Sequence, residues 1–335
     1  MSCLNSIYKK TNNHLLMKDL LWYFVLSLVI AGLVVLGLFW GSVDVSSLDE
    51  NSIYIIKNIR LPRVIMSLLC GAGLAVCGSA YQSIFQNPLS DPYILGVSSG
   101  ASLGAAVAIV LGLEAFFFGI GGFAFLFALA TVWIIIKIAS VGNRLHTTTL
   151  LLAGISINFL IAALIAILMV LNSENMDKII FWTMGSMSAT KFSDLWIVFV
   201  FVLIGIIVIR IYARELNAIL TGNESARSLG VNVERTKKII LLFSTLMIGI
   251  IVAKSGVIGF VGLIVPHIVR ILVGSDNRRI IPFSIFGGMI FMLLADILSR
   301  VLIAPSELPV GSITALIGSP FFIYLLYNAK KQLNP

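Results

Sequence analysis

Charged side chains are scarce in this sequence. Asp, Glu, Lys and Arg make up 11% of its 335 residues, and 59% are hydrophobic, whereas an average soluble domain is about 25% charged. The mean hydropathy is +1.05. These values exclude an ordinary soluble domain, because apolar runs long enough to cross a bilayer follow one another along the chain. The composition predicts an all-α, polytopic membrane protein.

Cysteine and histidine are also few. Three cysteines exclude a disulfide framework. Cys70 and Cys77 stand seven residues apart on one expected helix, about 10 Å from each other, too far for a disulfide, so we expect two small buried side chains. The histidines His14, His146 and His267 are far apart and lack zinc-like spacing. No metal site is expected.

The motifs of ATP hydrolysis and zinc proteolysis are missing. No G-x-x-x-x-G-K-[ST] run occurs, no glycine is followed by lysine, and no H-E-x-x-H occurs. The net charge of +8 comes from Lys and Arg placed between apolar runs, without the basic, aromatic-rich stripe of a nucleic-acid binder. We therefore expect a chain that is not an enzyme, holds no cofactor and binds no nucleic acid.

Apolar periodicity predicts ten membrane spans. The first run, Leu20–Trp40, is longer than the apolar region of a signal peptide and is followed by no cleavage site, so it is expected to remain as a span after a cytoplasmic arm, 1–19. The eighth carries Gly259 and Pro266 and is expected to be bent or to span only partly. The ten ranges are 20–40, 62–84, 92–112, 116–138, 148–171, 192–211, 237–254, 257–273, 280–303 and 309–328, within one transmembrane domain, 20–330.

The distribution of Lys and Arg predicts the orientation. If the N-terminus lies inside, the inner segments hold 16 of the 23 basic residues and the outer segments hold seven. Basic residues are enriched in cytoplasmic loops. Both termini are therefore expected in the cytoplasm.

A weak internal repeat runs through the chain. At an offset of 178 residues, five small or proline positions recur: Gly71 and Gly249, Ala75 and Ala253, Gly78 and Gly256, Pro88 and Pro266, Gly96 and Gly274. Spans 2–5 and 7–10 would then be copies of opposite topology, an inverted repeat of the kind found in transporters. Chance identity in a Gly- and Ala-rich chain remains the alternative.

A polar turn interrupts the apolar pattern between the second and third spans. Asn87 and Pro88 stand in it, and Gly96, Gly100 and Gly104 follow four residues apart. Glycines at this spacing share one helix face and permit backbone contact with another helix. Plain close packing explains the pattern; a gate beside a pathway is the sharper alternative, because broken helices in membranes line cavities.

The longest inner loop, 212–236, contains a second informative pattern. Thr221 and Glu224 have the spacing of a capping box, which predicts a helix of about two turns that ends at Gly230. Two interpretations of this helix remain: a solvated helix that only connects two spans, and a surface that binds a partner protein. Near the end of the ninth span, Asp296 and Arg300 are four residues apart and are expected to pair.

These motifs together resemble the FecCD family, the permease subunits of binding-protein-dependent ABC importers for iron–siderophore complexes, haem and cobalamin. The resemblance covers about residues 55–330, and Ser90 departs from it where Ala is common. It rests on Arg60-Leu61-Pro62-Arg63, Gln82, Asn87-Pro88-Leu89-Ser90-Asp91-Pro92, Leu95-Gly96, Gly100-Ala101, Gly222-Asn223-Glu224, Ala226, Leu229-Gly230-Val231, the run Gly256–Arg270, Asp296, Arg300, Pro305, Glu307–Gly311 and Gly318–Phe322.

The resemblance implies a multi-pass subunit of the bacterial cytoplasmic membrane that pairs with a second copy or a close relative. Two ATPase subunits, with their ATP and Mg, would dock inside, and a substrate-binding protein outside. It implies ATPase coupling by Thr221, Gly222, Asn223, Glu224, Ser225, Ala226, Arg227, Leu229 and Gly230. It implies docking of the binding protein at Arg60, Arg63 and Arg300, and a pathway past Ser156, Asn158, Ser312 and Thr314 on the fifth and tenth spans.

The function expected from this resemblance is inward transport of a metal chelate, a ferric siderophore first and haem or cobalamin as alternatives. An ion-coupled secondary transporter is the competing class, although ionisable residues deep in the spans are few. A membrane enzyme is a third class, for which no catalytic constellation is found.

Overall fold

Helices make up almost the whole chain. The computed structural model describes residues 2–43, 45, 47, 49–113, 119–141, 144–145 and 147–333. Its α-helices are α1 (Ser2–Phe39), α2 (Glu50–Ile55), α3 (Leu61–Ile84), α4 (Val97–Val110), α5 (Gly119–Ala139), α6 (Thr147–Leu171), α7 (Met176–Thr183), α8 (Phe192–Ile211), α9 (Ala213–Leu220), α10 (Asn223–Ser228), α11 (Val233–Ser255), α12 (Val261–Val273), α13 (Asn277–Val301) and α14 (Val310–Leu333).

Short elements join these helices. A π-helical turn, η1 (Ile56–Arg60), leads into α3, and the 3-10 turns η2 (Pro92–Leu95) and η4 (Ser173–Asn175) precede α4 and α7. The two-residue strands β1 (Ser140–Val141) and β2 (Arg144–Leu145) pair antiparallel, Ser140 opposite Leu145, between α5 and α6.

Each of the ten expected spans contains a helix, and the all-α class is confirmed. Within the described residues, seven helices are long and apolar enough to cross a membrane: Met17–Phe39, Glu50–Ile84, Gly119–Ala139, Thr148–Leu171, Phe192–Ile211, Val233–Ser255 and Asn277–Val301. Three apolar helices are shorter, Val97–Val110, Val261–Val273 and Val310–Leu325, and a span needs about 20 residues. Residues 116–118 of the fourth expected span and His146 lie outside the described residues.

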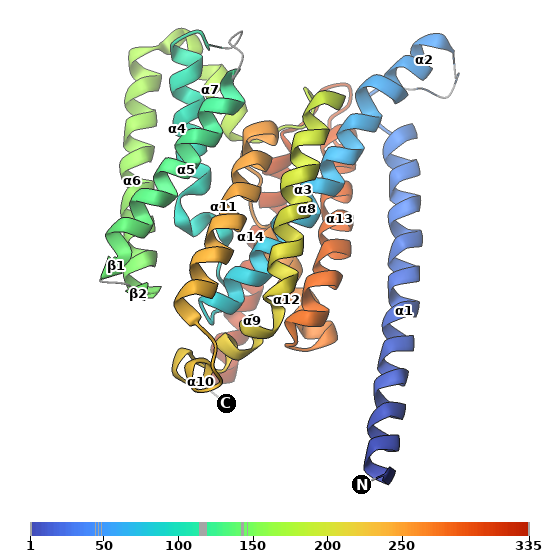
Figure 1. Ribbon diagram of the computed structural model, residues 1–335. Coiled ribbons are helices and arrows are strands. Elements are labelled where there is room, and N and C mark those ends of the chain that lie inside the picture. Colours follow the sequence, from blue (N-terminus) through green and yellow to red (C-terminus); the bar gives the residue numbers. More distant parts are fainter. Residues whose placement is uncertain are drawn as a thin grey trace.

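The first helix begins earlier than expected. Helix α1 runs without a break from Ser2 to Phe39, through the expected arm 1–19, and its apolar part begins at Met17. In Figure 1, α1 stands at the edge of the bundle beside α13. Only 6% of the most apolar part of this helix, within Met17–Phe39, is buried inside the bundle. Asp19 joins it to Arg279 of α13 through an ion pair of 2.6 Å.

Helix α3 lies at the centre of the bundle. Twenty of its 24 residues are buried, including Cys70 and Cys77, which are free thiols as expected. A Cβ atom on Gly71 would lie 2.1 Å from the carbonyl oxygen of Gly288 on α13, and one on Gly78 would lie 1.8 Å from that of Gly262 on α12. Two neighbouring helices therefore touch α3 at the backbone.

A second group of helices, α4 to α7, lies to the left of this core in Figure 1. Helix α11 packs against both groups. Its Gly249 faces the ring of Phe125 on α5, and a Cβ atom on Gly121 of α5 would lie 2.8 Å from the Ala253 oxygen. Small residues thus set the distance between the two groups.

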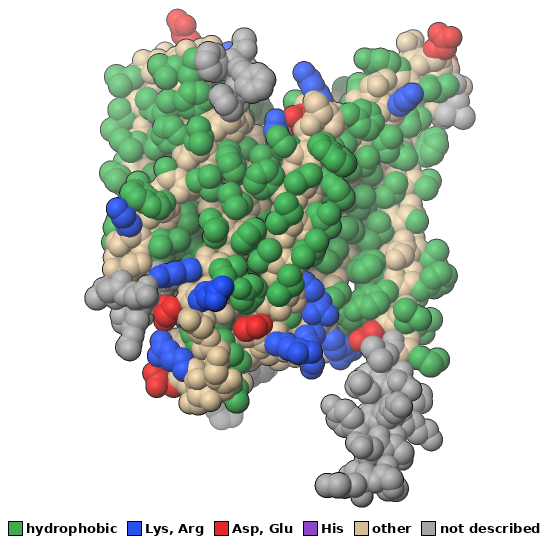
Figure 2. Space-filling view, in the orientation of Figure 1, with side chains coloured by type: hydrophobic (Ala, Val, Ile, Leu, Met, Phe, Trp, Pro, Cys, Tyr) green, Lys and Arg blue, Asp and Glu red, His purple; other side chains and the backbone are tan. Residues whose placement is uncertain are grey.

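The exterior of the bundle is apolar along its length and charged at its ends. Figure 2 shows hydrophobic side chains over the helix flanks, with Lys, Arg, Asp and Glu gathered mostly at the lower end. Large exposed apolar side chains cover α1, α6, α8 and α14. Together with the seven long helices, this surface is that of a multi-pass membrane protein, because in water it would be a large apolar patch.

The backbone contact at Gly78 yields a prediction about stability. We expect Gly78→Ala to destabilise the fold by about 3 kcal/mol, because the new methyl group meets a helix backbone that has no flexible end to move aside. Gly32→Ala on α1 is the matched control, since a Cβ atom there meets nothing within 4 Å. The melting temperature of each variant is measured in detergent as the temperature at which the monodisperse peak in size-exclusion chromatography is lost. Equal melting temperatures of the two variants would contradict the prediction.

Candidate functional site

The loop between α8 and α11 folds into two short helices, α9 and α10, which project from the end of the bundle where both termini lie (Figure 1). We call residues 213–230 the α9–α10 tip. Ile219, Ala226 and Val233 are buried together and form a small core of their own. The positive φ angles of Gly222, 119°, and Gly230, 83°, allow the chain to turn before and after α10.

The helix expected at this loop exists, but the expected capping box is wrong. Thr221 is the C-cap of α9, and its hydroxyl donates to the Ala218 oxygen at 2.8 Å. Gly222 is the N-cap of α10, and no side chain caps it. The helix has six residues, fewer than two full turns. A glycine at φ 119° takes the position at which a threonine side chain would cap.

Helix α9 is an element that was not predicted from the sequence. The sequence does contain a pattern that indicates this helix, because the apolar residues Ala213, Leu216 and Ile219 recur every three residues. All three are buried in the structure. Ala213 and Leu216 pack into the main core of the bundle, and Ile219 packs against Ala226 of α10.

The outer face of the tip carries charge and one large apolar side chain. The Glu224 side chain is 95% exposed, and Leu229 is 72% exposed. Arg227 donates to Glu224 at 3.3 Å and to Glu234 of α11 at 3.1 Å. An ordered helix that presents an exposed leucine between charges is suited to contact with another protein.

The polar turn after α3 contacts the tip directly. The Gln86 side chain donates to the Ile219 oxygen at 2.8 Å and reaches the Asn223 side chain at 3.5 Å. Asn87 and Pro88 are exposed beside it, and the Asn87 side chain accepts from the Leu89 amide at 2.9 Å. The interrupted stretch and the loop helix, two separate features of the sequence, therefore form one surface.

A second set of hydrogen bonds joins the tip to the core. The Asn217 side chain on α9 donates to Asp276 at 2.7 Å and accepts from the Asn277 amide at 2.7 Å. Ser83 of α3 donates to the Asn277 side chain at 3.0 Å. Because α3 and α13 also touch at Gly71 and Gly288, the tip is connected through α13 to both central helices.

Asp276 is the charged centre of this connection. Hydrogen bonds from Arg278 and Asn217 lower the pKa of Asp276 to about 2, against the effect of its partial burial. Its carboxylate also accepts from the Arg278 amide at 2.9 Å and so caps α13.

A buried ion network occupies the opposite end of the bundle. Arg63 of α3 donates to Asp296 of α13 at 2.6 Å and to Glu307 at 2.6 Å. Arg300 donates to Asp296 at 2.8 Å and to the Gly37 oxygen at 2.8 Å. Burial alone would raise the pKa of Glu307, but the hydrogen bond and charge of Arg63 hold it below its usual value.

The structure confirms the pair of Asp296 and Arg300 and gives the three expected docking arginines partners inside the chain. Arg60, Arg63 and Arg300 are 4%, 4% and 2% exposed. The Arg60 side chain donates to the Leu38 and Val43 oxygens. Each guanidinium group has acceptors among the residues of α1, α13 and the loops beside them, and docking of a binding protein at these arginines stays a prediction.

The glycines of the interrupted stretch pack against α5. A Cβ atom on Gly100 would lie 2.4 Å from the Thr131 hydroxyl, and one on Gly104 would lie 2.4 Å from the Phe123 oxygen. Gly96 stands outside the helix with φ 74°. Close packing, the plainer of the two interpretations, is what the described contacts show.

The eighth expected span is short. Residues 257–260 before Val261 are not helical, and α12 has 13 residues with Pro266 inside it, about 20 Å in length. Gly259 adjoins open space. The expectation of a segment that spans only partly agrees with this length.

The expected pathway residues divide into two groups. Ser156 on α6 and Ser312 on α14 are exposed, and Asn158 is half-buried and accepts a hydrogen bond from Ser99. Thr314 is fully buried, and its hydroxyl donates to the Gly311 oxygen of the same helix at 2.9 Å. The Thr314 hydroxyl is enclosed in this structure, and the pathway role of all four residues stays a prediction.

One further motif in this region has no catalytic context. Gly96–Gly100 matches the pattern G-x-S-x-G, which in serine hydrolases follows a strand. Here η2, a 3-10 turn, precedes it, and Ser98 lies in the first turn of α4. The pattern reflects helix packing by small residues.

Comparison with known proteins gives consistent results. Residues 20–328 match the FecCD transport family. The chain is 39% identical over 297 residues to the cobalamin import system permease protein BtuC of Halobacterium salinarum, with 87% of this chain and 80% of that protein covered. It is 38% identical over 314 residues to the hemin transport system permease protein HmuU of Yersinia pestis, with 92% and 93% covered.

A solved structure agrees in fold and sequence. A chain described as an inward-facing conformation of a metal-chelate type ABC transporter superposes with a TM-score of 0.82 at 33% identity, covering 91% of this chain and 98% of that one. The relatives named are thus permeases for different metal-containing ligands.

The ion network at Arg63 yields a prediction about stability. Arg63→Met should destabilise the fold by about 3–5 kcal/mol, because Asp296 would keep one guanidinium partner and stay fully buried. Lys57→Met, which removes an exposed charge at the same end, should change stability by less than about 1 kcal/mol. Thermal unfolding in detergent compares them, and equal stability of the Arg63→Met and Lys57→Met variants would count against the network.

The lowered pKa of Asp276 yields a prediction about pH. A depressed pKa contributes stability above about pH 4, and this contribution is lost as the pH falls toward 2. At pH 7, Asp276→Asn should cost about 1 kcal/mol, since solvent screens the partly exposed carboxylate. The melting temperatures of the two proteins should converge between pH 4 and pH 2; a gap that stays constant over this range would contradict the assignment.

Proposed function

Because the chain belongs to the FecCD transport family, it is the permease subunit of an ABC importer for metal chelates, and we propose that it carries a ferric siderophore inward, driven by a separate ATPase. The observation that carries the coupling part of this proposal is the α9–α10 tip. It is an ordered, exposed surface at the end that holds both termini, and it is hydrogen-bonded to the turn after α3 and to the start of α13.

The orientation of the chain follows from its charges. We propose that the end with the tip faces the cytoplasm, since 16 of the 23 Lys and Arg residues belong to segments expected on that side. The three shorter apolar segments, α4, α12 and Val310–Leu325 of α14, would complete ten crossings together with the seven long helices. Spans 2–5 and 7–10 would be the two copies of an inverted repeat.

The partners follow from this arrangement. Two ATPase subunits would bind the tips of two permease copies, which are identical or closely related. ATP binding would draw the tips together, and hydrogen bonds at Gln86 and Asn217 would pass the motion to α3 and α13. A substrate-binding protein would deliver the ligand at the opposite end, where the docking residues expected from the sequence, Arg60, Arg63 and Arg300, lie. The exposed faces of α6 and α14, with Ser156 and Ser312, are proposed to line the path.

The ligand is the finer part of the proposal. Ferric siderophores, haem and cobalamin are all large metal chelates, and the relatives named above include a hemin permease and a cobalamin permease. A path of mainly apolar residues with few hydroxyls and amides suits such ligands, which must pass without tight binding. Haem and cobalamin remain the alternatives. An ion-coupled secondary transporter is disfavoured, because the buried charges described above are paired with one another.

Charge reversal at the tip tests the coupling role. Glu224→Lys should reduce ATP-driven uptake of a ferric siderophore at least about tenfold while ATPase activity continues, because the exposed side chain supports contact with a partner and little of the fold. The assay uses proteoliposomes with the full complex. Leu229→Asp should act in the same way, through loss of an exposed apolar contact.

Glu174→Lys provides the matched control, since Glu174 is also exposed and lies near α7 at the opposite end of the bundle. Its uptake should equal that of the unchanged protein. Normal coupled uptake in both tip variants would remove the role assigned to the tip.

A further inference from the structure

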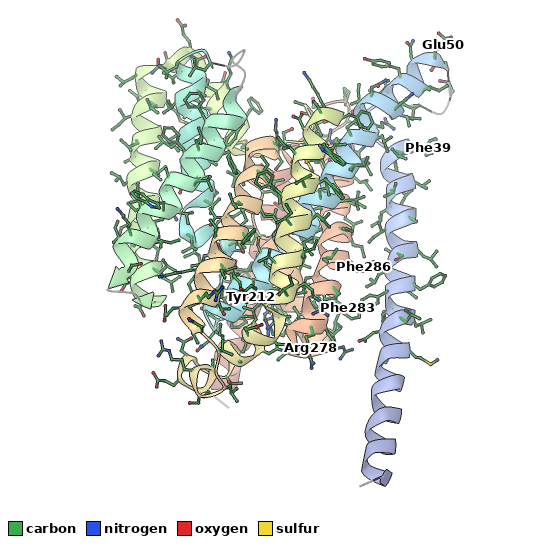
Figure 3. The ribbon with its side chains drawn as sticks, viewed as in Figure 1. Phe39, Glu50, Tyr212, Arg278, Phe283 and Phe286 are labelled. Carbon is green, nitrogen blue, oxygen red and sulfur yellow. The ribbon has the colours of Figure 1, made fainter. Side chains whose placement is uncertain are left out.

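A groove runs between α1 and the rest of the bundle. It has a volume of about 420 Å³. Trp22 and Leu26 of α1 form one wall, Ile268 and Leu272 of α12 form the other, and Gly287 of α13 lies on the floor. Figure 1 shows α1 at the edge of the bundle, and Figure 3 labels Phe283 and Phe286 of α13, whose rings pack against Tyr23 of α1.

The apolar part of this groove has the length of one bilayer leaflet. Its lining on α13 extends from Phe283 to Leu294, about 17 Å along the helix axis, and half of a hydrocarbon core is about 15 Å. Trp22 and Leu272 are 50% and 76% exposed in the groove walls. Within a membrane such walls contact acyl chains, because they offer water almost no hydrogen-bonding partners.

One end of the groove is basic. Lys18 of α1 and Arg279 of α13 line it at the end of the bundle that holds the termini. Arg279 is held by Asp19 at 2.6 Å and by the Val273 oxygen at 3.0 Å. Lys18 is exposed and makes no ion pair with any side chain that the structure describes.

The local charge favours an anion. Lys18, Arg278 and Arg279 supply three positive charges, and Asp19 and Asp276 supply two negative ones. The balance of +1 lies on Lys18, beside the mouth of the apolar groove. Basic residues between membrane helices at the cytoplasmic side are the usual partners of anionic lipid headgroups.

We propose that this groove binds one phospholipid with an anionic headgroup. Its acyl chains lie between α1 and α12 over Gly287, and its phosphate lies at Lys18. The lipid thereby completes the attachment of α1, whose own contacts with the bundle are concentrated on α13 through Asp19 and Tyr23. The proposal rests on the membrane location of the chain and not on its ligand or its ATPase.

The test counts lipids on the full chain by native mass spectrometry after purification in detergent and incubation with phosphatidylglycerol or phosphatidylcholine. The unchanged protein should retain one tightly bound phosphatidylglycerol, at least about fivefold more often than phosphatidylcholine. Lys18→Gln should bring this preference to about twofold or less, because the headgroup loses its cation. Lys57→Gln, at the opposite end, is the matched control and should keep the preference.

Variants that fill the groove test the position of the acyl chains. Gly287→Leu should abolish retention of both lipids, since a Cβ atom there already approaches Val265 at 2.9 Å. Gly32→Leu is its control, because that glycine adjoins open space on α1. If the Gly287→Leu variant does not fold, Ile268→Trp fills the groove from the wall at a residue that is 38% exposed.

Three results would overturn the proposal. Equal retention of the two lipids by the unchanged protein would indicate ordinary surrounding lipid. A preference in Lys18→Gln equal to that in Lys57→Gln would remove the headgroup site. Cross-linking of Ile268→Cys between two chains that retain no phospholipid would show that a second copy fills the groove.

Discussion

The rest of the structure depends on the backbone contacts of α3. Lipid supplies no hydrophobic force that drives helices together, so association in a membrane relies on close packing. At Gly71 and Gly78 the neighbouring helices α13 and α12 approach so closely that a single methyl group would overlap a carbonyl oxygen. These contacts fix the position of α13 along α3, and hence where Asp276 and Asp296 stand.

Helix α3 also connects the two ends of the molecule. Arg63, near its start, is bound to Asp296 and Glu307 in a buried network. At its other end, Ser83 contacts Asn277, and Gln86 just beyond it contacts the α9–α10 tip. These backbone contacts and the bonds at both ends connect α3 firmly to its neighbours. In the proposed importer these connections would transmit the motion of the ATPase to the path for the ligand.

Long apolar runs predicted the helices well, because in a membrane each span must satisfy its backbone within itself. Shorter-range detail was less predictable. The prediction that Thr221 caps α10 was wrong, because Gly222 is the N-cap and its backbone conformation lets α10 begin without a side-chain cap. The burial of Arg63 was not foreseen because its partner Asp296 lies 233 residues away, and no local pattern shows which basic residue points inward. Helix α9 could have been found from its buried face, which repeats every three residues.

The central claim is that this chain transports only as part of a complex with an ATPase. The most direct measurement is purification of the tagged chain from its native membrane in mild detergent, followed by quantitative mass spectrometry of the proteins that accompany it. We expect a protein with a Walker A motif in about equal amount. A chain that purifies without such a protein, and that still moves solute when reconstituted alone in vesicles, would contradict the account and identify a self-contained transporter.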